Sequence, residues 1–175
     1  EAMVIGDPLN PATQMGALIS PAHMDKVLGY IALGERQGAH LLTGGQRVVT
    51  GGLGNGAFVQ PTIFTDCTDD MDIVREEIFG PVLCVVRVPD MAAAITLINA
   101  HEFGNGVALF TSDGNTAREF SRRIEVGMVG INVPIPVPMA WHSFGGWKRS
   151  LFGDTHIYGE EGVRFYTRYK SIMQR

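Results

Sequence analysis

The sequence has few cysteines, few charged residues and no long apolar run, and each shortage excludes a class of protein. Only two of its 175 residues are cysteine, too few for a disulfide-stabilised extracellular scaffold. No stretch reaches the ~18 consecutive apolar residues of a membrane-spanning helix, so we expect no membrane association. The 14 basic residues are outnumbered by 18 acidic ones and form no run that could follow phosphates, so we expect no nucleic-acid partner.

Glycine and apolar residues are abundant instead. Glycine accounts for 22 residues, and 45% of the chain is hydrophobic while 18% is charged, against roughly 25% charged in a typical soluble domain. This length allows one domain with a sizeable core. A weakly charged, apolar chain predicts that a partner covers part of its surface. The first residues lack the basic and apolar regions of a signal peptide, as if the chain were cut from a larger protein.

Helix and strand patterns alternate along the chain. Ser20 and Pro21 predict the start of a helix whose apolar residues recur at helical spacing, and Gly38 predicts its end. Short connections between alternating elements indicate right-handed crossovers, so we predict an α/β fold with a parallel open twisted sheet and flanking helices. Further helices are expected at 90–100 and 115–123, and strands at 39–43, 57–64, 81–88, 106–110 and 128–132.

Two other segments are assigned from their pattern. Residues 163–173 alternate polar and apolar side chains, which predicts an edge strand able to pair with another chain. Residues 51–56 are rich in glycine, but the pattern after them is extended. A phosphate-binding loop needs a helix there, so we expect a solvent-exposed loop.

Glu76, Glu77 and Phe79 lie just before the most apolar predicted strand, where α/β sheets often form ligand crevices. A carboxylate in such a crevice can accept hydrogen bonds from both hydroxyls of a ribose, and Phe79 could pack on a planar ring. In the alternative interpretation, both glutamates are solvated charges at a helix end and Phe79 belongs to the core. Spacing alone favours the alternative.

Neither cysteine has the surroundings of a nucleophile. Cys67 lies among carboxylates that would raise its pKa, and Cys84 lies within an apolar strand. The proline-rich segment 133–148 predicts an extended run that either lines a substrate entrance or forms a rigid loop, with His142 as a weak acid–base candidate. The five histidines show no metal-ligand spacing, so we expect no metal site.

Several of these segments resemble the aldehyde dehydrogenase superfamily. They are Glu-Glu-Ile-Phe-Gly-Pro-Val at 76–82, Ser-Phe-Gly-Gly-Trp-Lys at 143–148 and Val-Ile-Gly-Asp-Pro-Leu at 4–9. Residues 81–175 look most like the CoA-acylating methylmalonate-semialdehyde dehydrogenase branch, and residues 1–80 look more like betaine-aldehyde-type enzymes. A chimera or an unusual natural member would explain this difference.

The resemblance implies an NAD-dependent oxidation of an aldehyde through a cysteine thioester, which water or coenzyme A resolves. It also assigns roles by position to three cofactor contacts and three residues of the substrate tunnel. The cofactor contacts are Glu77 at the nicotinamide ribose, Phe79 beside it and, with the weakest match, His23; the tunnel residues are Asn132, Pro134 and Phe144.

In the resembling family, the nucleophile, the general base and the dinucleotide-binding domain precede the matching segment. We therefore expect no catalytic residue in this chain and no aldehyde turnover by the chain alone. Residues 1–160 are expected to be part of a catalytic domain, and residues 161–175 a strand of an oligomerisation sheet in a homodimer or homotetramer. The expected location is the cytoplasm or the mitochondrial matrix. The alternative function is a non-catalytic oligomerisation module of the same fold.

Overall fold

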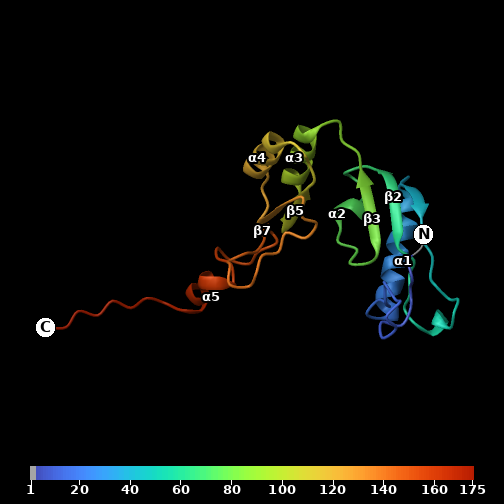
Figure 1. Cartoon of the computed structure of the whole chain (residues 1–175), viewed down its shortest axis with the longest axis horizontal. Coiled ribbons are helices and arrows are strands. Elements are labelled where there is room, and N and C mark those ends of the chain that lie inside the picture. Colours follow the sequence, from blue (N-terminus) through green and yellow to red (C-terminus); the bar gives the residue numbers. More distant parts are fainter. Residues whose placement is uncertain (1–2) are drawn as a thin grey trace. The chain divides into compact units, whose positions relative to one another are not determined.

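The computed structural model describes residues 3–175. The chain divides into two compact units, the first ending at Arg87 and the second beginning at Val88. In chain order, the elements are α1 (Pro21–Arg36), β1 (His40–Thr43), the 3-10 turn η1 (Leu53–Asn55), β2 (Thr62–Cys67), α2 (Asp72–Arg75), β3 (Val82–Val86), α3 (Met91–Ala100), β4 (Phe103–Gly104), β5 (Gly106–Leu109), α4 (Gly114–Arg123), β6 (Met128–Ile131), β7 (Trp147–Lys148) and α5 (Gly159–Tyr166) (Figure 1).

Helix α1 begins and ends as the sequence predicts. The Ser20 hydroxyl accepts a hydrogen bond from the backbone N–H of His23 at 3.1 Å, and Pro21 is the first helical residue. After the helix ends, Gly38 adopts a φ of +93°, the left-handed conformation that glycine allows at a helix C-terminus. The buried residues of α1 belong to the core of the first unit.

The sheet of the first unit has the order β1-β2-β3. Strand β2 begins at Thr62 and not at residue 57 as predicted. It is parallel to β3, as predicted, but antiparallel to β1. Parallel strands need a long crossover, and the chain between β1 and β2 contains only the turn η1. The chain therefore returns alongside β1 in the opposite direction. Phe64 on β2 is completely buried and packs with Val27 and Val59.

The glycine-rich segment 51–56 forms a turn around η1. Arg47 donates to the carbonyl of Gly54 at 2.5 Å, and no helix follows the segment before β2. The segment is therefore a loop, as expected. A phosphate-binding loop needs a helix directly after it, and this segment has none.

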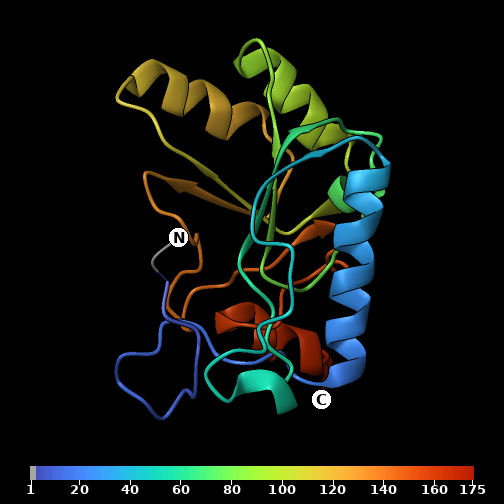
Figure 2. The same cartoon turned by 90° about the vertical axis from the view of Figure 1, so that its right-hand side faces the viewer.

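In the second unit, β5 and β6 form the expected parallel pair, while β4 and β7 form a short antiparallel pair. Helices α3 and α4 pack beside each other (Figures 1 and 2). Their contact and the β5–β6 pair enclose a separate core, which contains Ile95, Phe120, Ile124 and Val126.

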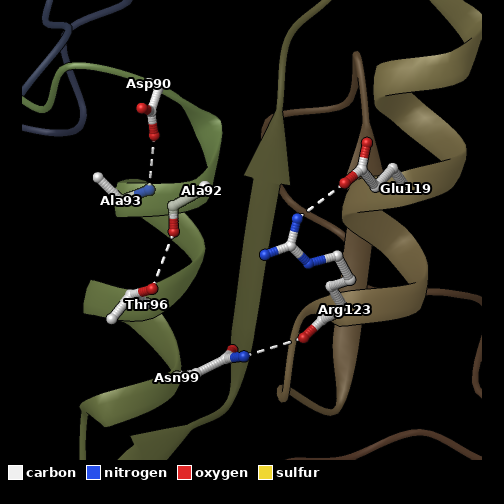
Figure 3. Close-up of polar contacts among 7 residues, drawn as sticks. All are labelled: Asp90, Ala92, Ala93, Thr96, Asn99, Glu119 and Arg123. Carbon is white, nitrogen blue, oxygen red and sulfur yellow. Dashed lines mark hydrogen bonds and ion pairs between the residues drawn. The ribbon is translucent and has the colours of Figure 1, made fainter.

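Polar side chains connect the ends of α3 and α4 (Figure 3). The Asp90 carboxylate accepts from the backbone N–H of Ala93 at 2.8 Å and caps α3 at the residue predicted for its start. Asn99 donates to the carbonyl of Arg123 at 2.9 Å, which satisfies one carbonyl at the end of α4. Arg123 also pairs with Glu119 at 2.7 Å along α4.

The strand predicted over 163–173 is wrong for its first four residues, which belong to α5. Glu160 and Glu161 lie in the first turn of that helix, where carboxylates stabilise the helix dipole, and Glu161 pairs with Arg164 at 2.7 Å. These local interactions stabilise a helix more than the alternating pattern of residues 163–166 favours a strand. Residues 167–175 are exposed and adopt neither helix nor strand (Figure 1). Within residues 3–175, no helix has the length and apolar character needed to cross a bilayer.

Candidate functional site

The loop between α2 and β3, residues 76–80, carries two of the predicted cofactor contacts. Ile78 points into the core of the first unit and is 7% exposed, whereas Phe79 is 75% exposed. The Glu77 side chain is also exposed, and within residues 3–175 its carboxylate makes no hydrogen bond. The buried isoleucine thus anchors the loop, and the acidic and aromatic side chains on either side of it remain available to a ligand.

One face of α1 holds this loop through polar contacts. The Nε2 atom of His23 lies 2.7 Å from the carbonyl oxygen of Phe79, and the two rings meet edge to face with 6.5 Å between their centres. Lys26 donates to the carbonyl of Glu77 at 3.5 Å, and the Tyr30 hydroxyl donates to the carboxylate of Glu76. Because residues 23, 26 and 30 are spaced by about one helical turn each, they share one side of α1.

The backbone of the loop is itself unusual. Phe79 has a φ of +57°, a left-handed conformation that a residue with a bulky side chain seldom adopts. Gly80 follows it and lies so close to Val27 of α1 that an added Cβ would approach a valine methyl to 2.6 Å. Only glycine fits at position 80. Strained residues of this kind gather at ligand sites, where surrounding contacts keep them in place.

Phe79 also forms the edge of an open groove of about 440 Å³. The groove is mainly apolar, which suits a flat ring or an aliphatic group. Its lining comes from the segment before α1, the residue Val59 and the start of β3: Met15, Gly16, Ala17, Leu18, Val59, Phe79, Gly80 and Pro81. Glu77 precedes this edge by two residues.

The three predicted tunnel residues lie in the second unit. Asn132 follows β6 with a φ of +58°, and its amide accepts from the N–H of Thr111 at 2.9 Å and donates to the carbonyl of Thr111 at 3.0 Å. Phe144 stacks on Tyr158 with ring centres 4.4 Å apart. Pro134 is exposed in the proline-rich run. The amide of Asn132 therefore holds the ends of β5 and β6 together, while Phe144 is fixed by a different neighbour.

The two cysteines have surroundings that suppress their reactivity. Cys67 is 5% exposed. Burial raises the pKa of the Cys84 thiol to about 11, with a further contribution from nearby Cys67, so Cys84 is a neutral thiol at physiological pH. His142 accepts a hydrogen bond from the indole of Trp141 at 3.0 Å. In the described part of the chain, no three His, Cys, Asp or Glu residues are grouped as they would be around a metal ion.

Sequence reasoning missed Lys26 and Tyr30, although it named His23. The apolar residues of α1 at helical spacing, such as Val27 and Ile31, predict the helix and its buried face. The polar residues at 23, 26 and 30 follow the same spacing, but their partners lie 46 to 56 residues further along the chain. The spacing could have indicated a shared polar face, yet nothing local indicates which loop that face contacts.

Comparison with known proteins places these features in a family. The model described as "Aldehyde dehydrogenase family" matches residues 1–172. A malonate-semialdehyde dehydrogenase of Pseudomonas aeruginosa is 55% identical over the whole chain, and that of Halalkalibacterium halodurans is 44% identical over 99% of it. In both cases the match covers 35% of the relative. The chain thus spans about a third of the length of these curated relatives.

Solved structures give the same result. Methylmalonate-semialdehyde dehydrogenase from Oceanimonas doudoroffii is 52% identical, with a TM-score of 0.93 over 99% of this chain and 36% of that one. Betaine aldehyde dehydrogenase from Staphylococcus aureus, in complex with NAD+, is 34% identical, with a TM-score of 0.87 over 94% of this chain and 32% of that one. Each similarity extends across nearly the whole chain rather than across one half of it.

Proposed function

This chain belongs to the aldehyde dehydrogenase family, and we propose that it is part of an NAD-dependent enzyme that oxidises malonate semialdehyde or methylmalonate semialdehyde to an acyl-CoA. The match of 55% identity to a malonate-semialdehyde dehydrogenase supports this substrate class. One observation supports a cofactor-binding role for this chain. The Glu77 carboxylate is exposed and makes no hydrogen bond to residues 3–175, and it lies two residues before Phe79, which has a left-handed backbone and lines the groove.

The residues of this loop fit the nicotinamide riboside part of NAD+. A carboxylate has two oxygens that accept hydrogen bonds, which suits the two neighbouring hydroxyls of a ribose. The exposed ring of Phe79 offers a flat apolar surface, and the groove behind it is lined mainly by apolar groups. Bound here, NAD+ would supply the hydride acceptor for oxidation of the substrate carbon once the cysteine has added to it. Glu77 would hold the sugar, and Phe79 would limit the movement of the ring.

We assign the rest of the chemistry to two other regions. Asn132, Pro134 and Phe144 line the substrate tunnel in this proposal, with Phe144 held by Tyr158. The nucleophilic cysteine belongs to a part of the protein outside these 175 residues, because burial makes both Cys67 and Cys84 unsuitable. The resulting thioester is resolved by coenzyme A in this proposal.

Binding of NAD+ by the full-length protein that contains this segment tests the proposed role of Glu77. Isothermal titration calorimetry should detect NAD+, and Glu77→Gln should weaken binding about tenfold or more, since hydrogen bonds to a charged group are worth roughly 1.5–3 kcal/mol. The control is Glu35→Gln, an exposed carboxylate at the far end of α1. Equal affinities of the two variants, or no NAD+ binding at all, would contradict the proposal.

Turnover by the chain alone tests the assignment of the nucleophile. We expect no NADH from the 175-residue chain with malonate semialdehyde, coenzyme A and NAD+, because a thiohemiacetal cannot form without a reactive thiolate. NADH production that is lost when either Cys67 or Cys84 is replaced by alanine would identify a nucleophile within the chain and refute this assignment.

A second candidate function, an oligomerisation module, is favoured by residues 167–175. Thr167 already has extended backbone (φ −123°, ψ 163°), and Tyr169, Ile172 and Met173 are each more than four-fifths exposed. We propose that this segment pairs as a strand with a second copy of the chain. Side chains at 169 and 173 share one face of such a strand.

Light scattering measures this association. Tyr169→Ser with Met173→Ser should lower the mass toward that of a monomer, whereas the control pair Arg168→Ser with Lys170→Ser, on the opposite face, should leave an oligomer. A monomeric native chain, or an unchanged mass when Tyr169 and Met173 are both replaced by serine, would rule out the oligomerisation module.

A further inference from the structure

We infer that His23 is a positioning residue, which holds Phe79 in its left-handed conformation and so presents the Glu77 carboxylate to the ribose. This inference rests on the function proposed above. It differs from a direct cofactor contact, because His23 acts on the backbone of the loop rather than on the ligand. Three observations carry it: a hydrogen bond, a strained residue and the attachment of His23 to a rigid helix.

The hydrogen bond joins the strained residue directly to α1. The carbonyl of Phe79 can only accept, so the Nε2 atom of His23, 2.7 Å away, carries the hydrogen and donates it. Phe79 has a φ of +57°, which local sterics disfavour for a residue with a Cβ. The conformation therefore needs support from outside the loop, and the His23 hydrogen bond acts on the strained residue itself.

His23 is well suited to fix a backbone position. It lies in the first turn of a 16-residue helix, and its own N–H is bound to the Ser20 hydroxyl at 3.1 Å. Its side chain is short and half-buried, so few rotamers are open to it. The other contact to a loop carbonyl comes from the exposed Lys26 at 3.5 Å, through a long and flexible stem. The rigid contact is the one at position 23.

The same face of α1 explains why Glu77, and not Glu76, is available to a ligand. The Tyr30 hydroxyl occupies the carboxylate of Glu76, and Ile78 is buried in the core. Glu77 lies between these two anchored residues, with its carbonyl held by Lys26 and its carboxylate in solvent. Of the two consecutive glutamates, only Glu77 therefore keeps both of its oxygens for a ligand.

Nuclear magnetic resonance of the chain without NAD+ tests the support of Phe79. A positive φ brings the amide and α protons of the same residue close, which gives a strong nuclear Overhauser effect between them. The effect should be strong in the native chain, lost in His23→Ala, and restored in His23→Gln, whose side-chain amide can donate to the same carbonyl. His40→Ala removes an exposed histidine of β1 in the same unit and serves as the control.

The NAD+ affinities of the native sequence and the same three variants, measured in the full-length protein that contains this segment, complete the test. We expect His23→Ala to bind about tenfold more weakly, while His23→Gln and His40→Ala stay within about twofold of the native chain. A strong effect at Phe79 that persists in His23→Ala would overturn the inference whatever the affinities are. Absence of NAD+ binding by the full-length native protein would instead refute the proposed function, and the nuclear Overhauser data would still decide whether His23 holds Phe79.

Discussion

Replacing Lys148 tests how the motif around Phe144 is attached to the second unit. The Lys148 ammonium donates to three carbonyls at the end of α3: Asn99 at 2.8 Å, His101 at 3.2 Å and Ile98 at 3.5 Å. The Ile98 carbonyl also accepts the backbone N–H of His101 at 3.2 Å, and all three carbonyls lie at the negative end of the helix dipole. Lys148→Met keeps the aliphatic part of the side chain and removes the charge, so the change isolates these hydrogen bonds.

The expected loss follows from the geometry. Two of the three distances are those of good hydrogen bonds, and a hydrogen bond to a charged group contributes roughly 1.5–3 kcal/mol before opposing terms. Fixing a lysine side chain costs about 1.5–2 kcal/mol of rotamer entropy, and its ammonium is partly desolvated. A net loss of about 2 kcal/mol in the free energy of unfolding of the second unit is therefore expected, including the interaction with the helix dipole.

Urea unfolding followed by tryptophan fluorescence measures this loss. Trp141 and Trp147 are the two tryptophans of the chain, and both lie in the second unit, so the signal reports that unit. With a slope of about 1–3 kcal/mol per molar urea, Lys148→Met should lower the midpoint by roughly 1 M. The control is Lys170→Met in the exposed C-terminal segment. Equal midpoints for the two variants would refute the assigned role of Lys148.

Three further predictions concern other parts of the chain. Phe64→Ala should destabilise the first unit by about 3–5 kcal/mol, measured by circular dichroism in urea, because Phe64 is fully buried. The backbone N–H of Thr116 lowers the pKa of Asp113 in the folded chain. The urea midpoint measured by fluorescence should therefore fall as the pH drops below about 4, and Asp113→Asn should reduce this fall. Iodoacetamide at about pH 8 should leave Cys84 unmodified until urea unfolds the chain, as shown by mass spectrometry, because its pKa is about 11.

Elements whose signals are local could be predicted from the sequence. Ser20, Pro21 and Gly38 define α1 through their own backbone geometry, and Asp90 defines the start of α3. The direction of β1 could not be predicted in this way, because strand direction depends on the connection that follows. Helix α5 could not be predicted from the alternating pattern after residue 163, because the two glutamates of its first turn and the Glu161–Arg164 pair stabilise a helix instead.

The candidate site was predicted only in part. Spacing alone favoured solvated charges at positions 76 and 77, and the family motif was needed to select Glu77. The structure gives a physical reason for that selection, because Tyr30 occupies Glu76 and leaves Glu77 without a hydrogen bond to residues 3–175. This reason depends on a pair of residues separated by 46 positions, so no local pattern contains it.

The left-handed residues mark where long-range contacts determine the backbone. Among residues 3–175, four non-glycine residues have a positive φ, and three of them are Phe79, Asn132 and Lys148. Asparagine adopts this conformation readily, so Asn132 needs little support. Phe79 and Lys148 do not, and each makes a hydrogen bond to a residue 47 or more positions away. A strained backbone persists only when other contacts oppose its relaxation. Removal of either distant contact should therefore let the left-handed residue return to a negative φ. The geometry at Phe79 and Lys148 thus depends on the folded unit rather than on the local motif alone.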